Sequence, residues 1–184
     1  MKVKVIAVLL SFIVISVFGQ TEIFSLAKVG MPKQVEEAVL AGARINDRSV
    51  DTGMTPLMIA ARNNKYPAVI TALIKAGANL DDRDELDAAT PLMIAAGWNA
   101  NPDVVLALLD AGAKIDDRDK FNNKTALMFA AMYNTNPEVV FALLNAGADG
   151  RLKSFKGLTA WDYADRNPAL KGTQAWLDLD QARK

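Results

Sequence analysis

Short apolar segments recur along this chain at a fixed interval of thirty-five residues. The sequence TPLMIAA occupies residues 55–61 and again 90–96, and TALMFAA occupies residues 125–131. In each copy the leucine and the two alanines share one face of an α-helix, because residues three and four apart lie one above the other. The threonine before each segment is a favoured N-cap, since its hydroxyl can accept a hydrogen bond from an amide of the first turn. The pattern therefore predicts three short, closely packed helices.

A second apolar pattern follows each of these helices after a polar break. It begins at a proline, which is tolerated at the first position of a helix because no hydrogen bond is lost there. It stops at a glycine, which closes a helix C-terminus in the left-handed conformation at the lowest cost. The prolines are Pro67, Pro102 and Pro137, and the glycines are Gly77, Gly112 and Gly147. Asn101 and Asn136 stand where they can cap the second and third of these helices.

A fixed period of this size is typical of a stacked repeat protein, in which each unit packs only against its neighbours. We assign full repeats to residues 55–89, 90–124 and 125–158. Fainter copies at residues 21–54 and 159–184 are expected to cap the stack, because an interior repeat leaves apolar surface open on both sides. From each glycine to the next threonine the chain is polar, so we expect loops that project from the stack.

Helix, turn, helix, glycine and projecting loop, in three copies in register, resemble the ankyrin repeat. The resemblance extends from Thr21 to the C-terminus and implies an all-α solenoid of helix-turn-helix units with protruding hairpin loops. The family pattern TPLHxAA has a histidine where this chain has Met58, Met93 and Met128, which are expected to fill that space by packing. The resemblance also implies a concave surface, formed by the first helices and the loops, that binds another protein.

Two rows of side chains are predicted to line that surface. The first row follows the paired alanines, and the second lies at the loop tips. The candidate partner-binding residues are Arg62, Asn63, Trp98, Met132, Tyr133 and Arg166 in the first row, and Leu86, Phe121 and Phe155 in the second. Tryptophan, tyrosine and arginine dominate the energetics of protein interfaces. Alternatively, these aromatic and aliphatic side chains pack on the linkers between helices or on neighbouring loops and take no part in binding.

Composition narrows the chemistry that this chain can perform. Its 184 residues include no cysteine and no histidine, which excludes disulfides, thiolate nucleophiles, imidazole bases and the usual zinc ligand sets. The aspartates at 81–87 and 116–119 lack the glycine and terminal glutamate of a helix-loop-helix calcium site, and we interpret them as a solvated face. Loop residues Arg48, Arg83 and Arg118 are expected to pair with such carboxylates. We therefore assign no catalytic residue, metal site or cofactor, and expect no enzyme.

The first nineteen residues have the pattern of a cleavable secretory signal. Lys2 and Lys4 precede an apolar run at residues 5–18, and Val17 and Gly19 stand at the positions expected before a cleavage site. The alternative is an uncleaved anchor, although the run is shorter than the roughly 20 residues that usually span a bilayer. Without this segment the chain has 19 basic and 21 acidic residues, a net charge of −2, so neither nucleic acid nor an anionic membrane is a favoured partner. Absence of cysteine favours bacterial export over the disulfide-rich eukaryotic route.

These features predict an exported, monomeric and non-catalytic protein that binds another protein in the periplasm or outside the cell and inhibits, protects or assists it. No small-molecule substrate is expected. Other hypotheses are a secreted effector that acts on a host or prey protein, and a structural scaffold without a single high-affinity partner. An enzyme would have to use carboxylates and lysines alone, and would need a pocket that a repeat stack seldom builds.

Overall fold

The computed structural model describes residues 22–184, and the predicted signal segment at residues 1–19 lies outside the described residues. After a helix over residues 22–29, the chain forms α2 (Pro32–Leu40), α3 (Pro56–Asn63), α4 (Pro67–Lys75), α5 (Pro91–Trp98), α6 (Pro102–Asp110), α7 (Ala126–Tyr133), α8 (Pro137–Asn145), α9 (Ala160–Ala164) and α10 (Gln174–Ala182). Within residues 22–184 there is no strand. No helix in that range is long and apolar enough to span a bilayer.

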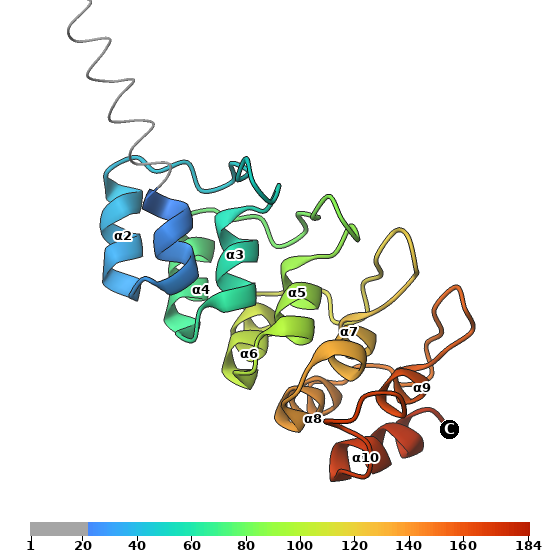
Figure 1. Ribbon diagram of the computed structural model, residues 1–184. Helices are drawn as coiled ribbons and strands as arrows, with labels where there is room; N and C mark the ends of the chain where they lie inside the picture. Colours follow the sequence, from blue (N-terminus) through green and yellow to red (C-terminus); the bar gives the residue numbers. More distant parts are fainter. Residues whose placement is uncertain (1–21) are drawn as a thin grey trace, which may run out of the picture.

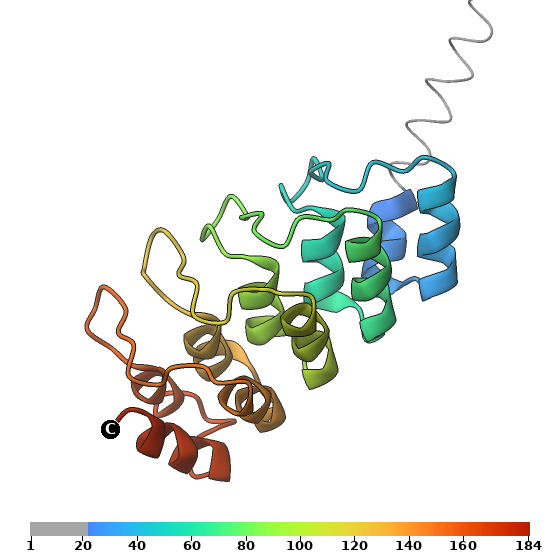
Figure 2. The same cartoon turned by 180° about the vertical axis from the view of Figure 1, so that it is seen from behind.

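The helices form two rows, and the loops project from one side of the stack (Figures 1 and 2). The inner row contains the helix over residues 22–29 followed by α3, α5, α7 and α9, and the outer row contains α2, α4, α6, α8 and α10. From α3 onward each inner helix packs on the inner helix of the next repeat, and each outer helix packs on the next outer helix. The all-α solenoid of helix-turn-helix units with protruding loops is therefore confirmed.

The residues predicted to begin and end the helices form the expected N-cap hydrogen bonds and left-handed C-terminal turns. The hydroxyls of Thr55, Thr90 and Thr125 accept hydrogen bonds of 3.4 Å from the amides three residues further on. Asn101 caps α6 in the same way through the amide of Asp103, at 3.0 Å. At the end of α4, Gly77 has a φ of +93° and its amide donates to the carbonyl of Ile74. Left-handed glycines also follow α6 and α8, so the predicted helix ends are confirmed.

The core lies between the two rows and consists mainly of leucine, valine, alanine and methionine. Met58, Met93 and Met128 are buried in the inner row, as expected of side chains that replace a histidine by packing. Met93 does more than pack, because its sulfur lies 3.5 Å from the amide nitrogen of Thr90 and accepts a weak hydrogen bond. The expectation that methionine acts only by filling space is therefore wrong at this position.

The C-terminal unit closes the stack with side chains that differ from those of the full repeats. Trp161 of α9 packs against Trp176 of α10 with ring centroids 5.5 Å apart, and the Arg183 guanidinium lies 3.6 Å from the centroid of the Trp161 ring. Asp162 accepts hydrogen bonds of 2.7 Å from both the amide and the hydroxyl of Thr159. Burial raises the pKa of Asp162, but these hydrogen bonds outweigh it and hold that pKa below its ordinary value.

Candidate protein-binding surface

A buried asparagine follows each inner helix from α3 to α9 and joins its repeat to the preceding one. The side-chain amide of Asn99 donates to the carbonyls of Ala61 and Asn64 at 2.9 Å each, and its oxygen accepts from the amide of Asn101 at 3.0 Å. Asn64, Asn134 and Asn167 make the equivalent bonds at the other joints. At each joint between repeats, these bonds satisfy one carbonyl in the last turn of the preceding inner helix, which has no intrahelical partner, and one carbonyl in the linker after it. They also fix the residue before each asparagine at the rim of the inner surface.

Three loop arginines join each loop to the next. Arg48 donates to the carbonyls of Gly53, in its own loop, and Arg83, in the next, at 2.7 and 2.9 Å. Arg83 and Arg118 repeat this arrangement one and two loops further along. Arg83 also pairs with a carboxylate, that of Asp117 at 2.6 Å, whereas Arg48 and Arg118 form no salt bridge within residues 22–184. The expected pairing of all three arginines with carboxylates is thus wrong for Arg48 and Arg118, which bind backbone carbonyls and hold the loops in register.

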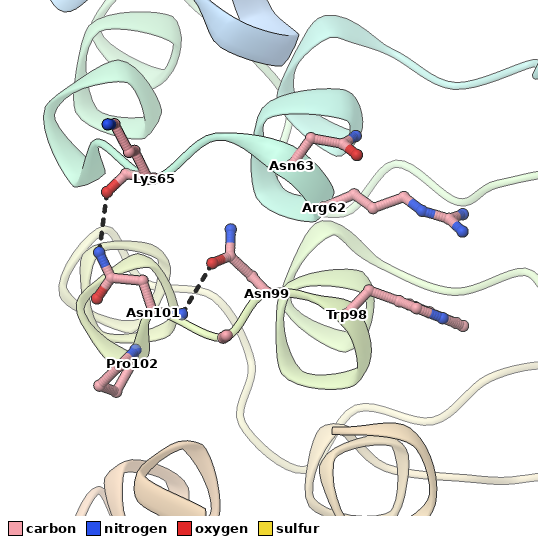
Figure 3. A pocket seen from close by; sticks show the side chains of 8 residues that line it. Arg62, Asn63, Lys65, Trp98, Asn99, Asn101 and Pro102 are labelled. Atoms are coloured by element: carbon pink, nitrogen blue, oxygen red, sulfur yellow. Dashed lines mark hydrogen bonds between the residues drawn. The ribbon is translucent and has the colours of Figure 1, made fainter. Parts of the chain in front are cut away.

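Arg62, Trp98 and Tyr133 come from three successive repeats and lie against one another on the inner surface. The Arg62 guanidinium lies 5.1 Å from the centroid of the Trp98 ring. The rings of Trp98 and Tyr133 are stacked, with centroids 5.1 Å apart and an interplanar angle of 17°. In Figure 3 the side chains of Arg62 and Trp98 extend in the same direction, away from Asn101 and Pro102 in the neighbouring linker. We call these three residues, with Phe129 and Lys124 beneath them, the aromatic cluster.

Phe129 and Lys124 form the floor of the aromatic cluster and were not among the predicted site residues. The Phe129 ring is fully buried, with its centroid 5.8 Å from that of Trp98 and 6.0 Å from that of Tyr133. Lys124 is only 6% exposed, and its Nζ lies 4.8 Å from the Phe129 centroid and 5.7 Å from the Tyr133 centroid. An ammonium over an aromatic face is attracted to it by the ring quadrupole.

The sequence contains a signal that could have identified Lys124. The residue directly before the capping threonine is apolar in the neighbouring copies, namely Met54, Ala89 and Leu158. A lysine in that register places a charge where the other repeats place a core side chain. Phe129 is harder to recognise, because isoleucine in the equivalent positions is also apolar and only the ring distinguishes it.

An open groove of about 530 Å³ adjoins the aromatic cluster, between the ends of α3 and α5 (Figure 3). Its lining combines Arg62, Lys65 and Trp98 with the asparagine-rich linker after α5. A second groove, of about 470 Å³, lies on the other side of Arg62 and Asn63, against the helix over residues 22–29 and the first loop. Arg62 therefore lies on a ridge between two concave regions that another molecule can enter.

The remaining predicted site residues are accessible but dispersed. Asn63 donates to the carbonyl of Ile59 on its own helix, at 3.0 Å, and Met132 and Arg166 are exposed near the ends of α7 and α9. At the loop tips, Leu86 is 73% exposed, Phe121 61% and Phe155 70%. These three side chains project from their loops, and Trp98 and Tyr133 stack on each other along the row of repeats.

The loop aspartates with the lowest exposure point inward. Asp84 accepts hydrogen bonds from the amides of Asp87 and Ala89, and Asp119 accepts from four successive amides at residues 121–124. Among residues 22–184 no group of three or more acidic, histidine or cysteine side chains is placed to hold a metal ion. These two carboxylates shape the loops instead.

Comparison with known families agrees with this architecture. A family profile described as three copies of ankyrin repeats matches residues 23–119, and a single ankyrin-repeat profile matches residues 122–153. The first match alone covers more than half of the chain, so the protein belongs to the ankyrin-repeat family. Proteins of this family are generally non-catalytic modules for protein–protein interaction, and no enzyme family is indicated. Comparison with curated proteins finds no significant match.

Proposed function

We propose that this protein binds another protein through the aromatic cluster on its inner surface. The observation that supports this proposal is the Trp98–Tyr133 stack, which is partly exposed, with Tyr133 39% accessible. Large aromatic side chains at a protein surface are costly to hydrate and are enriched among the residues that dominate interface energies. The cluster therefore offers a partner a preformed apolar anchor.

The aromatic cluster is also well suited to bind without reorganising. Trp98 is held between Arg62 and Tyr133, so little side-chain entropy remains to be lost when a partner covers it. Within residues 22–184 neither the Arg62 guanidinium nor the Trp98 indole N–H makes a hydrogen bond to another group. Both donors are available to carbonyls or carboxylates of a partner.

The place of action follows from the predicted secretory signal at residues 1–19. We propose that the chain is exported, that cleavage after Gly19 releases it, and that it acts as a monomer in the periplasm or outside the cell. There it would inhibit, protect or assist the protein that it binds, without catalysing a reaction itself.

Capture of partners from periplasmic extract tests the binding proposal. Trp98→Ala combined with Tyr133→Ala should remove the partner retained by the wild-type protein, as measured by quantitative mass spectrometry of the bound fraction. The matched control is Leu106→Ala with Leu177→Ala, two exposed apolar side chains on the outer helices, which should retain it. Equal retention by both double variants would contradict the proposal. Helical circular dichroism checks that each variant is folded, and Arg62→Ala provides a milder change at the same surface.

Export is tested separately by the mass of the purified extracytoplasmic protein. The expected N-terminus is Gln20. Recovery of a chain beginning at Met1 from the membrane fraction would instead indicate an uncleaved anchor.

A further inference from the structure

The four loop tips change the sign of their charge along the stack. The tip before α3 presents Asp51, and the tip before α5 presents Glu85, Leu86 and Asp87. The two tips before α7 and α9 present Lys120, Phe121, Lys153, Phe155 and Lys156 instead, and we call these five residues the basic tips. The row of loop tips therefore has an acidic end and a basic, aromatic end.

The two loops that form the basic tips are joined through their backbones. The amide of Phe155 donates to the carbonyl of Asn122 at 2.9 Å. The carbonyl of Lys153 accepts from the Arg118 guanidinium at 3.0 Å and from the side-chain amide of Asn123 at 3.2 Å. Because these bonds fix the loops to one another, the lysines and the two exposed phenylalanines are held on adjacent tips before any partner arrives.

In the part of the chain that the structure describes, the ammonium groups of the basic tips are unpaired. Within residues 22–184, Lys120, Lys153 and Lys156 make no salt bridge and no hydrogen bond through their ammonium groups. The nearby carboxylates make their hydrogen bonds and ion pairs with other groups, although those bound only to neutral donors keep their negative charge. Asp119 binds backbone amides, Asp149 pairs with Arg151 at 3.0 Å, Asp162 binds Thr159, and Asp165 pairs with Lys171 at 3.1 Å. Three lysines without an ion-pair partner thus lie beside two exposed aromatic rings.

We propose that the basic tips bind an acidic segment of the partner protein, in which carboxylates alternate with apolar side chains. The inference rests on the proposed function and specifies the chemistry of the partner. The carboxylates lie against Lys120, Lys153 and Lys156, and the apolar side chains cover Phe121 and Phe155. Complementary charge of this kind steers association and fixes the orientation of a complex.

Two other molecules could bring negative charge to the basic tips: a nucleic acid and a second copy of this chain. The first fits less well, and the second is distinguished by experiment. A nucleic acid longer than the basic tips would run onto the acidic tips, where Asp51, Glu85 and Asp87 repel phosphate. A second copy of this chain offers a matching Glu85–Leu86–Asp87 tip, and sedimentation of the protein alone distinguishes that case.

The test uses fluorescence anisotropy with a labelled, soluble peptide that combines glutamates with two phenylalanines. The wild-type protein should bind this peptide more tightly than its analogue with glutamine in place of glutamate, and binding should weaken as salt is raised. Lys153→Glu with Lys156→Glu should weaken binding about tenfold, because two attractions become two repulsions. The matched control, Glu85→Lys with Asp87→Lys, reverses the same number of charges on the acidic tip and should bind at least as tightly as wild type.

Three results would overturn the inference. These are equal binding of the two peptides, tighter binding of an oligothymidylate than of the glutamate peptide, and concentration-dependent self-association that either charge reversal abolishes. The partner-capture experiment keeps the two proposals apart. If Trp98→Ala with Tyr133→Ala abolishes capture but Lys153→Glu with Lys156→Glu does not, the proposed function is supported. The inference that the partner binds through an acidic segment is then contradicted. The reverse pattern would contradict binding through the aromatic cluster and would support binding through the basic tips.

Discussion

Trp98 and Asn99 are adjacent at the end of α5, but their side chains face different surroundings. Asn99 is buried and bonds to two carbonyls of the preceding repeat, and the equivalent positions in the neighbouring repeats are also asparagine. Trp98 lies on the inner surface, where the equivalent positions hold Asn63 and Tyr133. Within this chain, the position that joins the repeats is fixed by a single hydrogen-bond geometry, whereas the exposed position beside it differs from repeat to repeat.

Each repeat therefore has two roles at neighbouring positions: the buried asparagine holds the repeats together, and the exposed residue before it is available to bind a partner. Substitution at a joint should change the free energy of unfolding, because buried carbonyls lose their partners. Substitution at the rim should change binding with little change in stability. The following predictions test that separation, and they run from the largest expected change in stability to the smallest.

Leu108→Ala should have the largest effect on stability. Leu108 is fully buried in α6, and truncation of a core leucine leaves a cavity that costs about 2 to 5 kcal/mol. Urea unfolding followed by circular dichroism measures the change. The control is Leu106→Ala on the same helix, where the side chain is 37% exposed and the loss should be below about 1 kcal/mol. Similar losses for the two variants would mean that the packing of α6 differs from that described.

Asn99→Ala should destabilise the protein by about 1 to 3 kcal/mol. The substitution leaves the carbonyls of Ala61 and Asn64 without their donor in a buried joint, and an unsatisfied buried group costs its full desolvation. Asn63→Ala is the matched control, since its side chain is exposed and bonds only within its own helix, and it should change stability by less than about 0.5 kcal/mol. An Asn99→Ala protein as stable as wild type would show that the asparagine joints do not hold the repeats together.

Trp98→Ala should remove an aromatic pair worth about 0.5 to 1.5 kcal/mol of stability, in addition to the area that the half-buried side chain covers. Its effect on partner binding should be larger, at least about 2 kcal/mol, if Trp98 is an interface anchor. Unfolding titrations and binding titrations on the same preparation measure both quantities. A loss of stability that exceeds the loss of binding free energy would mean that Trp98, like Asn99, serves mainly to hold the repeats together.

Ala88→Gly should stabilise the protein by about 1 kcal/mol. Ala88 has a φ of +54°, a left-handed conformation that costs a residue with a Cβ roughly 1 to 2 kcal/mol, and the equivalent residue in the first loop is Gly53, with a φ of +65°. Part of the gain is offset by the greater freedom of glycine in the unfolded chain. A thermal melt that shows Ala88→Gly to be less stable than wild type would contradict this account of the loop.

Acidification should give the smallest effect, at Asp162. The pKa of this carboxyl is lower in the folded protein than in the unfolded chain, so its contribution to stability is present above the unfolded pKa of about 4 and is lost as the pH falls through the folded pKa. Asp162→Asn should therefore reduce the dependence of unfolding free energy on pH in that acidic range. Identical pH dependence in the two proteins would mean that Thr159 does not favour the ionised carboxylate.

Much of the fold is predictable from the sequence because its signals act locally. A threonine caps the helix that it precedes, a proline occupies the first turn, and a glycine ends the second helix, each within a few residues of its partner. The period of thirty-five residues then specifies that these units stack. The candidate rim residues are also predictable, since their register relative to the paired alanines places them on the inner side.

The joints between repeats and the packing of the aromatic cluster depend on tertiary structure. The Asn99 amide reaches Ala61, thirty-eight residues earlier, and Arg83 reaches the carbonyl of residue 118 in the next loop. The contact between Lys124 and Tyr133 likewise requires a loop to fold over the helix that follows it.

By itself, the sequence determined the repeat, the helix boundaries and the side of the stack on which the variable residues lie, because hydrogen bonds and periodicity within one repeat are enough to specify them. Only the tertiary structure decided that Arg62, Trp98 and Tyr133 stack into one surface and that the basic tips are joined. Those arrangements depend on the distance and angle between successive repeats, which result from the packing of all the helices together.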